Sequence, residues 1–218
     1  MASAVDFKKA QKDLYQPGAK PSIVDVPPMV FLLADGHGDP NLSPAYQSAV
    51  EVLYGLSYAI KMSKMGSNQP AGYFDFVVPP LEGLWSVEDS AFTGGGAPIA
   101  DKGKFRWTMM IRQPDFVTPE VLAMAKGVLA KKKPGLDPGI VRLETLTEGL
   151  CAQVLHTGPY DDEPATIAAL DAFIADSGHA PDFSGQRRHH EIYLSDPRKT
   201  APEKLKTIIR HPVRRSAS

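Results

Sequence analysis

The sequence contains a single cysteine, Cys151, so the 218-residue chain cannot form an internal disulfide bond. A chain without disulfides is typical of a reducing compartment. The sequence also lacks the run of roughly 20 apolar residues that a membrane-spanning helix needs. Its first residues include Lys8, Lys9 and Lys12 and no apolar segment of a signal peptide. We therefore expect a cytoplasmic protein with no membrane partner.

An excess of positive charge is missing as well. The 24 Lys and Arg residues are balanced by 25 Asp and Glu residues, which gives a formal net charge of −1. A nucleic-acid-binding face needs clustered cations that pair with phosphates. The two basic clusters, residues 131–133 and 210–215, are short, and the first falls at a predicted helix end, where cations complement the helix dipole. We therefore expect no nucleic-acid partner.

Apolar residues make up 43% of the chain and charged residues 22%, the composition of an ordinary globular domain. Helices are expected to begin after Ser43, after Thr118 and near Glu163, because each position is followed by a proline that suits the first helical turn. Apolar runs of strand length lie between them. The expected strands are residues 29–34, 73–78, 105–112, 150–156, 189–194 and 207–211. This mixture predicts the α+β class.

The predicted elements occur in the order strand, glycine turn, helix, strand, strand, and they do so twice. Both final strands end in the sequence Ile-Arg-x-Pro. We predict two β-α-β-β repeats, of about residues 27–133 and 140–213, within one domain of residues 27–218 that follows an N-terminal arm of residues 1–26. Repeats of this kind meet about a pseudo-twofold axis, and the cleft between them is the expected central pocket.

The sequence His-His-Glu-Ile-Tyr-Leu near the end of the chain carries the main candidate site residues. Because side chains alternate along a strand, Glu191 and Tyr193 share one face and Ile192 lies on the other. We expect the Ile192 face to pack on the helices and the Glu191 face to line a pocket. A buried carboxylate needs a partner. Glu191 is therefore either a structural partner of Arg112 or Arg210, or a pocket residue that binds a cation or acts as a general base.

Large apolar side chains on neighbouring strands supply candidate ligand contacts. Trp85, Trp107 and Met109 suit a planar ligand, although each is also consistent with a core position. Glu82 and Trp85 point to opposite faces of a regular strand. Both reach a pocket only if Gly83 forms a bulge.

We expect neither a metal nor a cofactor. His189 and His190 stand beside Glu191, but adjacent strand residues face opposite ways, and no HExxH helix is present. Cys151 lies in an apolar run and is expected to be a small core residue. Glu148 and Glu163 are further acids that the sequence does not exclude from the pocket.

The chain resembles the stand-alone branch of the GyrI-like small-molecule-binding family over roughly residues 29–213. The resemblance is carried by an ordered set of motifs: residues 36–41 (Gly-His-Gly-Asp-Pro-Asn), 80–85 (Pro-Leu-Glu-Gly-Leu-Trp), 107–114, 156–163 (His-Thr-Gly-Pro-Tyr-Asp-Asp-Glu), 189–194 and 207–210. It implies a curved antiparallel sheet of duplicated units with two long helices. It also implies that Glu191 meets cationic aromatic ligands, with Tyr193 beside it. We expect Glu82, Trp85, Trp107, Met109 and Tyr160 to contact the ligand as well.

Three functions follow from this resemblance. The first is stand-alone binding of planar, apolar or cationic compounds by a monomer or homodimer, for detoxification. The second is hydrolysis of cyclopropane-containing DNA-alkylating natural products, with Glu191 as general base and Tyr193 as a hydrogen-bond donor to developing charge. The third is a gyrase-inhibitor-like interaction with another protein. Only about 26 residues precede the first expected strand, too few for a helix-turn-helix domain.

Overall fold

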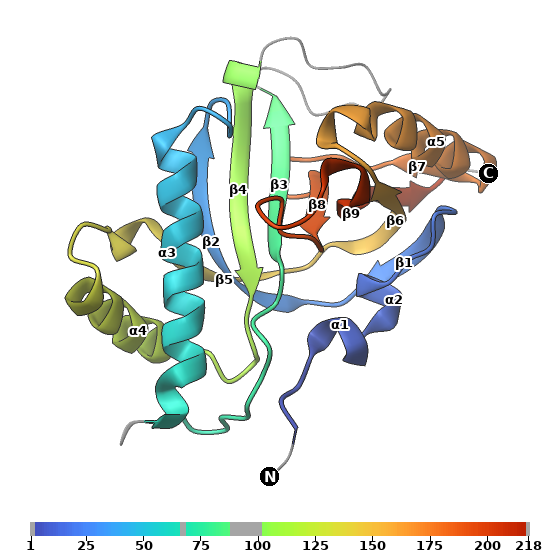
Figure 1. Cartoon of the computed structure of the whole chain (residues 1–218). Helices are drawn as coiled ribbons and strands as arrows, with labels where there is room; N and C mark the ends of the chain where they lie inside the picture. The colour runs from blue at the N-terminus through green and yellow to red at the C-terminus, as the bar shows by residue number, and fades with distance from the viewer. Residues whose placement is uncertain (1–2, 66–68, 88–101, 217–218) are drawn as a thin grey trace.

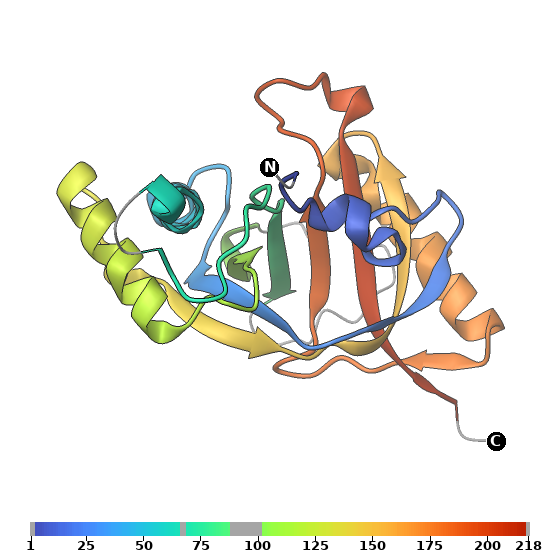
Figure 2. The ribbon, with the colours of Figure 1, turned by 90° about the horizontal axis from the view of Figure 1, so that it is seen from below.

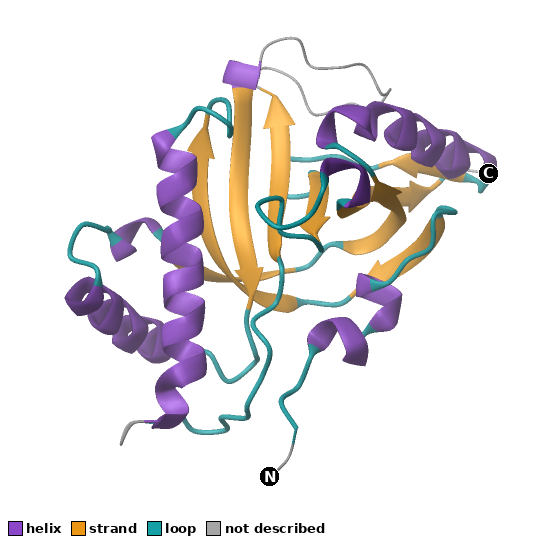
Figure 3. Ribbon diagram, viewed as in Figure 1, coloured by secondary structure: helices purple, strands orange, loops and turns teal. Residues whose placement is uncertain are grey.

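The computed structural model describes residues 3–65, 69–87 and 102–216, in which strands form the centre and helices lie around them (Figures 1 and 3). The strands are β1 (Ser22–Val26), β2 (Met29–His37), β3 (Leu81–Val87), β4 (Phe105–Arg112), β5 (Arg142–Leu146), β6 (Gly149–Thr157), β7 (His179–Pro181), β8 (His189–Tyr193) and β9 (Lys206–Arg215). The α-helices are α1 (Phe7–Ala10), α2 (Lys12–Tyr15), α3 (Pro44–Lys61), α4 (Pro119–Lys132) and α5 (Glu163–Asp176). Short 3-10 turns are η1 (Met62–Met65), η2 (Lys102–Lys104), η3 (Pro138–Ile140), η4 (Tyr160–Asp162) and η5 (Pro202–Lys204).

The three long helices begin at the predicted positions, and two of them, α3 and α4, have a side-chain cap. Ser43 accepts a hydrogen bond from the Tyr46 amide at the start of α3, and Thr118 accepts one from the Val121 amide at the start of α4. Each helix, α5 included, has a proline in its first turn. Among the described residues, none of the helices combines the length and apolarity needed to cross a bilayer.

The sheet confirms the α+β class and shows how the two repeats are joined. Its strand order is β1-β6-β9-β8-β3-β4-β2-β5, with β7 attached to β9, and all named pairs are antiparallel. The first repeat supplies β2, β4 and β3, the second supplies β6, β9 and β8, and they meet at β3 and β8. The order is therefore that of a duplicated β-α-β-β unit with an internal twofold relation. The sheet is curved and unclosed, with α4 and α5 at its opposite ends (Figure 2).

The prediction of a strand at residues 73–78 is wrong. This segment forms a single bridge, between Phe76 and Val5, and the strand of the first repeat is instead β3. The reason lies in the sheet, because β4 is flanked on one side by β2 and on the other by β3, which leaves no position for a further strand.

The N-terminal residues pack against the same sheet. Strand β1 pairs with β6, and Leu14 and Tyr15 of α2 are buried in a cluster that includes Ile192 and Leu84. The Ile192 face was expected to meet the long helices, and this is wrong. Helix α3 packs on the other face, which carries Trp85, because the N-terminal segment already covers the Ile192 face.

Candidate functional site

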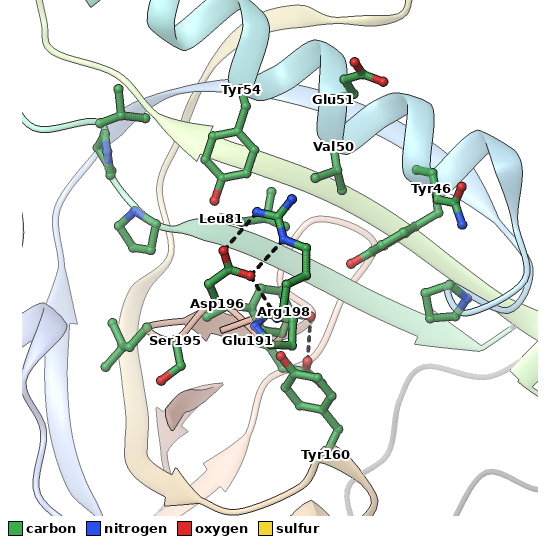
Figure 4. Close-up of a pocket in the computed structure, with 18 of the residues that line it drawn as sticks. Tyr46, Val50, Glu51, Tyr54, Leu81, Tyr160, Glu191, Ser195, Asp196 and Arg198 are labelled. Carbon is green, nitrogen blue, oxygen red and sulfur yellow. Dashed lines mark hydrogen bonds and ion pairs between the residues drawn. The ribbon is translucent and has the colours of Figure 1, made fainter. Parts of the chain in front are cut away.

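A cavity of about 2060 Å³ opens where the two repeats meet. Its walls come from α3, the central strands β3 and β8, the turn η4 with the first residues of α5, and the segment that follows β8. Tyr46 and Tyr54 extend from α3 toward the side that carries Glu191 and Tyr160 (Figure 4). The part of the wall around Glu191 thus carries several aromatic rings, among them Tyr46, Trp85 and Tyr160.

Glu191 and Tyr193 both line this cavity, as their shared strand face predicts. The Tyr193 hydroxyl donates to Glu191 Oε2 at 2.7 Å and accepts from Trp85 Nε1 at 3.0 Å. Burial and the adjacent Glu191 carboxylate raise the pKa of Tyr193 well above its ordinary value. Tyr193 is therefore a neutral phenol whose proton is directed at Glu191 and whose position is fixed by Trp85.

The indole of Trp85 reaches Tyr193 because it crosses directly over Gly83. A Cβ atom at Gly83 would stand 2.8 Å from Trp85 Nε1 and 3.2 Å from Met109 Sδ. Real Cβ atoms do not approach other atoms so closely, so a larger residue would displace the indole. The glycine thus serves close packing, and no bulge is present at this point of β3.

Glu163, the first residue of α5, is the acid that the sequence left open and the structure brings to Glu191. It is 6% exposed and lines the cavity. Burial, and then the charge of Glu191 close by, raise the pKa of Glu163 far above that of an ordinary glutamate. Glu163 therefore keeps its proton to a higher pH than an ordinary glutamate does.

The remaining expected ligand contacts divide into two groups. Trp85 and Tyr160 line the cavity, and the Tyr160 ring meets the Tyr193 ring edge-on, with centroids 5.8 Å apart. Glu82, Trp107 and Met109 are not among the lining residues.

Regular strand geometry explains the position of Glu82. Strands β3 and β8 pair without interruption from Leu81 to Trp85, so Glu82 points away from the cavity. There it accepts from the Tyr15 hydroxyl at 3.2 Å and lies 3.0 Å from His190 Nε2.

Trp107 and Met109 lie on the cavity side of the sheet but beneath α3, where they are 1% and 0% exposed. The Trp107 ring packs over Gly36 and meets the edge of Tyr46. Tyr46 and Tyr54 take their place as aromatic walls. The sequence contained a hint of this, because both tyrosines lie on the apolar face of α3. A tyrosine hydroxyl on a buried helix face needs a hydrogen-bond partner or a polar cavity.

Neither arginine considered as a structural partner contacts Glu191. Arg210 Nη1 lies 3.0 Å from Glu148 Oε2, and Arg112 donates to Gln11. Burial alone would raise the pKa of Glu148, but His190 and Arg210 lower it to about 2. The buried charges of the opposite face thus compensate one another, and Glu191 is left to the cavity.

Glu191 has one more neighbour, since its Oε1 lies 2.9 Å from His189 Nε2. Across the described ranges, no group of three or more His, Cys, Asp or Glu side chains is arranged to hold a metal ion. The site is therefore built from two carboxyl groups, a phenol and an imidazole beneath aromatic walls.

The fold and the site define a duplicated α+β domain with a central small-molecule cavity. The family model of the GyrI-like small-molecule-binding domain matches residues 19–214, so the chain belongs to this family. No match is found among curated proteins.

Solved structures agree with this assignment. A protein of Listeria innocua, described as an uncharacterized conserved protein, is 49% identical, and the match covers 96% of this chain and 100% of that one with a TM-score of 0.89. A second Listeria innocua protein, described as a hydrolase, is 47% identical over 96% of this chain and 100% of that one, with a TM-score of 0.87. The EcmrR C-terminal domain is 12% identical over 90% of this chain and 98% of that one, with a TM-score of 0.51, which shows a shared fold alone.

Proposed function

We propose that the protein is a hydrolase that adds water to flat, mostly apolar electrophiles held in the central cavity. The observation that carries this proposal is that Glu191, which accepts a hydrogen bond from the Tyr193 hydroxyl and lies 2.9 Å from His189 Nε2, shares the cavity with the buried carboxyl group of Glu163. Burial, and then Glu191, raise the pKa of Glu163, which suits Glu163 to the role of an acid beside a base. The 47% identical protein of Listeria innocua described as a hydrolase supports the same reaction class.

Each group then has a distinct role. Glu191 takes a proton from a water molecule as the water oxygen attacks the substrate carbon. Tyr193 positions Glu191, because its only proton is already donated to that carboxylate. The acid that delivers a proton to the leaving or conjugated oxygen is therefore Glu163, and Tyr193 does not take the donor role expected from the sequence.

The substrate class follows from the walls and from the family resemblance. Trp85, Tyr46 and Tyr160 offer aromatic surfaces that hold a flat ring system in a fixed position. A strained cyclopropane fused to a conjugated ring suits these groups, since water forms the new C–O bond while the strained C–C bond breaks and its electrons pass to the conjugated oxygen. Removal of such DNA-alkylating compounds is detoxification.

Binding without turnover is the second candidate function. It is favoured by the position of Glu191 beside aromatic rings, because a cationic aromatic compound gains from contact with both a carboxylate and the ring faces. The same residues would then act as a sink for drugs.

Product analysis separates the two candidates. The protein is incubated with a cyclopropanoid, and the ring-opened product with one added water is measured by mass spectrometry. We expect Glu191→Gln and Glu163→Gln each to lower the rate about 100-fold or more, the usual effect of losing a general acid or base. Glu144→Gln on the exposed edge strand β5 is the matched control and should keep the wild-type rate. Saturable binding with no product from the wild type would refute the hydrolase.

A further inference from the structure

The cavity contains a phenol whose hydroxyl the protein itself does not use. Tyr46 of α3 lines the cavity, and its hydroxyl points into the space that Glu191 also faces (Figure 4). Tyr15, Tyr73 and Tyr193 each donate a hydrogen bond from the hydroxyl to a protein oxygen, at 3.2, 2.6 and 2.7 Å. No group among the residues that the structure describes is hydrogen-bonded to the hydroxyl of Tyr46. A tyrosine hydroxyl in a partly enclosed site usually finds a partner, so this one is available to a ligand.

The ring of Tyr46 is held in place on two sides. It stacks on Trp85, with centroids 6.3 Å apart and planes at 30°, and it meets Trp107 edge-on, with centroids 5.2 Å apart. Both indoles are buried. The main chain is fixed as well, because the Tyr46 amide donates to Ser43 Oγ at 3.3 Å in the first turn of α3. The hydroxyl therefore points in a set direction before any ligand enters, which is what a preorganised donor requires.

The Tyr46 hydroxyl is suited to donate a hydrogen bond and not to release its proton. Burial, and then the charge of Glu191, raise the pKa of Tyr46 well above its ordinary value. The phenol therefore keeps its proton at neutral pH, and the group that it lacks is an acceptor for that proton. An oxygen that gains negative charge accepts such a hydrogen bond more strongly than a neutral oxygen does.

We propose that the Tyr46 hydroxyl binds the carbonyl oxygen of a flat conjugated ketone in the cavity and stabilises the negative charge that this oxygen gains during ring opening. The second half of this proposal rests on the hydrolase function proposed above. Glu191 lies on β8 of the second repeat and Tyr46 on α3 of the first, so the base and the donor reach a flat ligand from different walls of the cavity. Tyr46 is thus a catalytic residue as well as an aromatic wall.

The reaction balances with Tyr46 as a donor that keeps its proton. The water oxygen forms a bond to a carbon of the strained ring, and a C–C bond of that ring breaks. The electrons of the broken bond pass through the conjugated system to the carbonyl oxygen. Glu191 takes one proton from the water and Glu163 gives one to this oxygen. No net proton is released, and transfer of one proton from Glu191 back to Glu163 restores both carboxyl groups.

Tyr46→Phe tests the catalytic half, because phenylalanine keeps the ring and its contacts and removes the hydroxyl alone. With a cyclopropane-fused conjugated ketone as substrate, we expect kcat to fall about 100-fold, the usual effect of losing one donor to a developing oxyanion. The Tm should stay close to the wild-type value, because the hydroxyl has no protein partner to lose.

Tyr58→Phe is the matched control for both measurements. Tyr58 lies on the same helix, 52% exposed and about 18 Å further along the axis, and its variant should keep the wild-type kcat. A kcat of Tyr46→Phe within about threefold of the wild type would overturn the catalytic role. A clear loss of Tm in Tyr46→Phe but not in Tyr58→Phe would also overturn it, since the hydroxyl would then serve the fold.

A binding measurement needs no turnover and so separates the ligand contact from the hydrolase. The probes are 9-fluorenone, a flat ketone, and fluorene, the same ring system without the oxygen. Binding is followed by quenching of tryptophan fluorescence, since Trp85 lines the cavity. The ratio of the fluorenone Kd to the fluorene Kd should rise about 3- to 10-fold in Tyr46→Phe, the effect of one lost hydrogen bond, and stay unchanged in Tyr58→Phe.

The outcomes of this measurement do not depend on the reaction. A raised ratio in Tyr46→Phe alone supports the contact even if no hydrolysis is found. An unchanged ratio, or no saturable binding of fluorenone to the wild type, overturns the contact even if hydrolysis is confirmed.

Discussion

Gly83→Ala is the substitution for which the structure predicts an effect much larger than its chemistry suggests. One methyl group is added to β3, and it would lie 2.8 Å from Trp85 Nε1. Ordinary contacts of a Cβ atom begin near 3.4 Å, so the indole has to move by about 0.6 Å or more. Met109 Sδ, 3.2 Å from the same point, blocks the methyl group on its other side.

The cost of this movement can be worked from the contacts of Trp85. A shifted indole loses its hydrogen bond to Tyr193, and an unsatisfied buried donor costs about 1–3 kcal/mol. Replacing glycine by alanine in a strand recovers roughly 0.5–1 kcal/mol of that loss through backbone entropy. We therefore expect a net loss of up to about 2 kcal/mol, or several degrees in Tm for a chain of this size.

Thermal unfolding followed by tryptophan fluorescence checks this prediction. Gly127→Ala is the matched control, because Gly127 lies within α4 and its added Cβ would meet nothing within 4 Å. The control should gain up to about 1 kcal/mol from helix propensity, while Gly83→Ala should lose stability, shift its tryptophan emission and lower kcat through a displaced Tyr193. Equal stability of the two variants with unchanged emission would refute the packing argument.

Two further predictions concern buried charge. Because the folded-state pKa of Glu163 is raised, its carboxyl group stabilises the fold below its unfolded pKa and loses that contribution as pH rises toward the folded value. The free energy of unfolding, measured by urea titration, should therefore fall between pH 5 and pH 8 in the wild type and less steeply in Glu163→Gln; parallel curves would contradict this. Glu148→Gln leaves the buried Arg210 without its carboxylate and leaves His190, whose pKa the two glutamates raise to about 9 against the effect of burial, with Glu82 alone; it should cost about 3–5 kcal/mol by the same measurement. A loss below about 1 kcal/mol would show that solvent reaches this network.

Local chemistry made much of the fold predictable. The helix starts at Ser43 and Thr118 follow from side-chain caps and prolines, which act over a few residues. The alternation that directs Glu191 and Tyr193 to one side is likewise a property of a single strand. The choice between residues 73–78 and β3 could not be predicted in this way, because it depends on which positions beside β4 are already occupied.

The candidate site was predictable only in part, for the same reason. Glu191, Tyr193, Trp85 and Tyr160 line the cavity, whereas Trp107 is covered by a helix whose position the sequence does not state. Glu163 begins α5, far from β8 in the chain, and its altered pKa arises from burial beside Glu191. Acidic residues at the start of a helix are usually explained by their favourable interaction with the helix dipole. The sequence around Glu163 therefore gave no reason to place this residue in the cavity.

The antiparallel junction of β3 and β8 has a consequence for how such proteins diversify. Two identical copies joined about a symmetry axis would have to carry the same residue on both central strands, and every change would occur twice. In the fused chain, β3 presents Gly83 and Trp85 while β8 presents Glu191 and Tyr193. The two halves therefore contribute different groups to one site: β3 supplies the indole that holds Tyr193, and β8 supplies the carboxylate that Tyr193 positions.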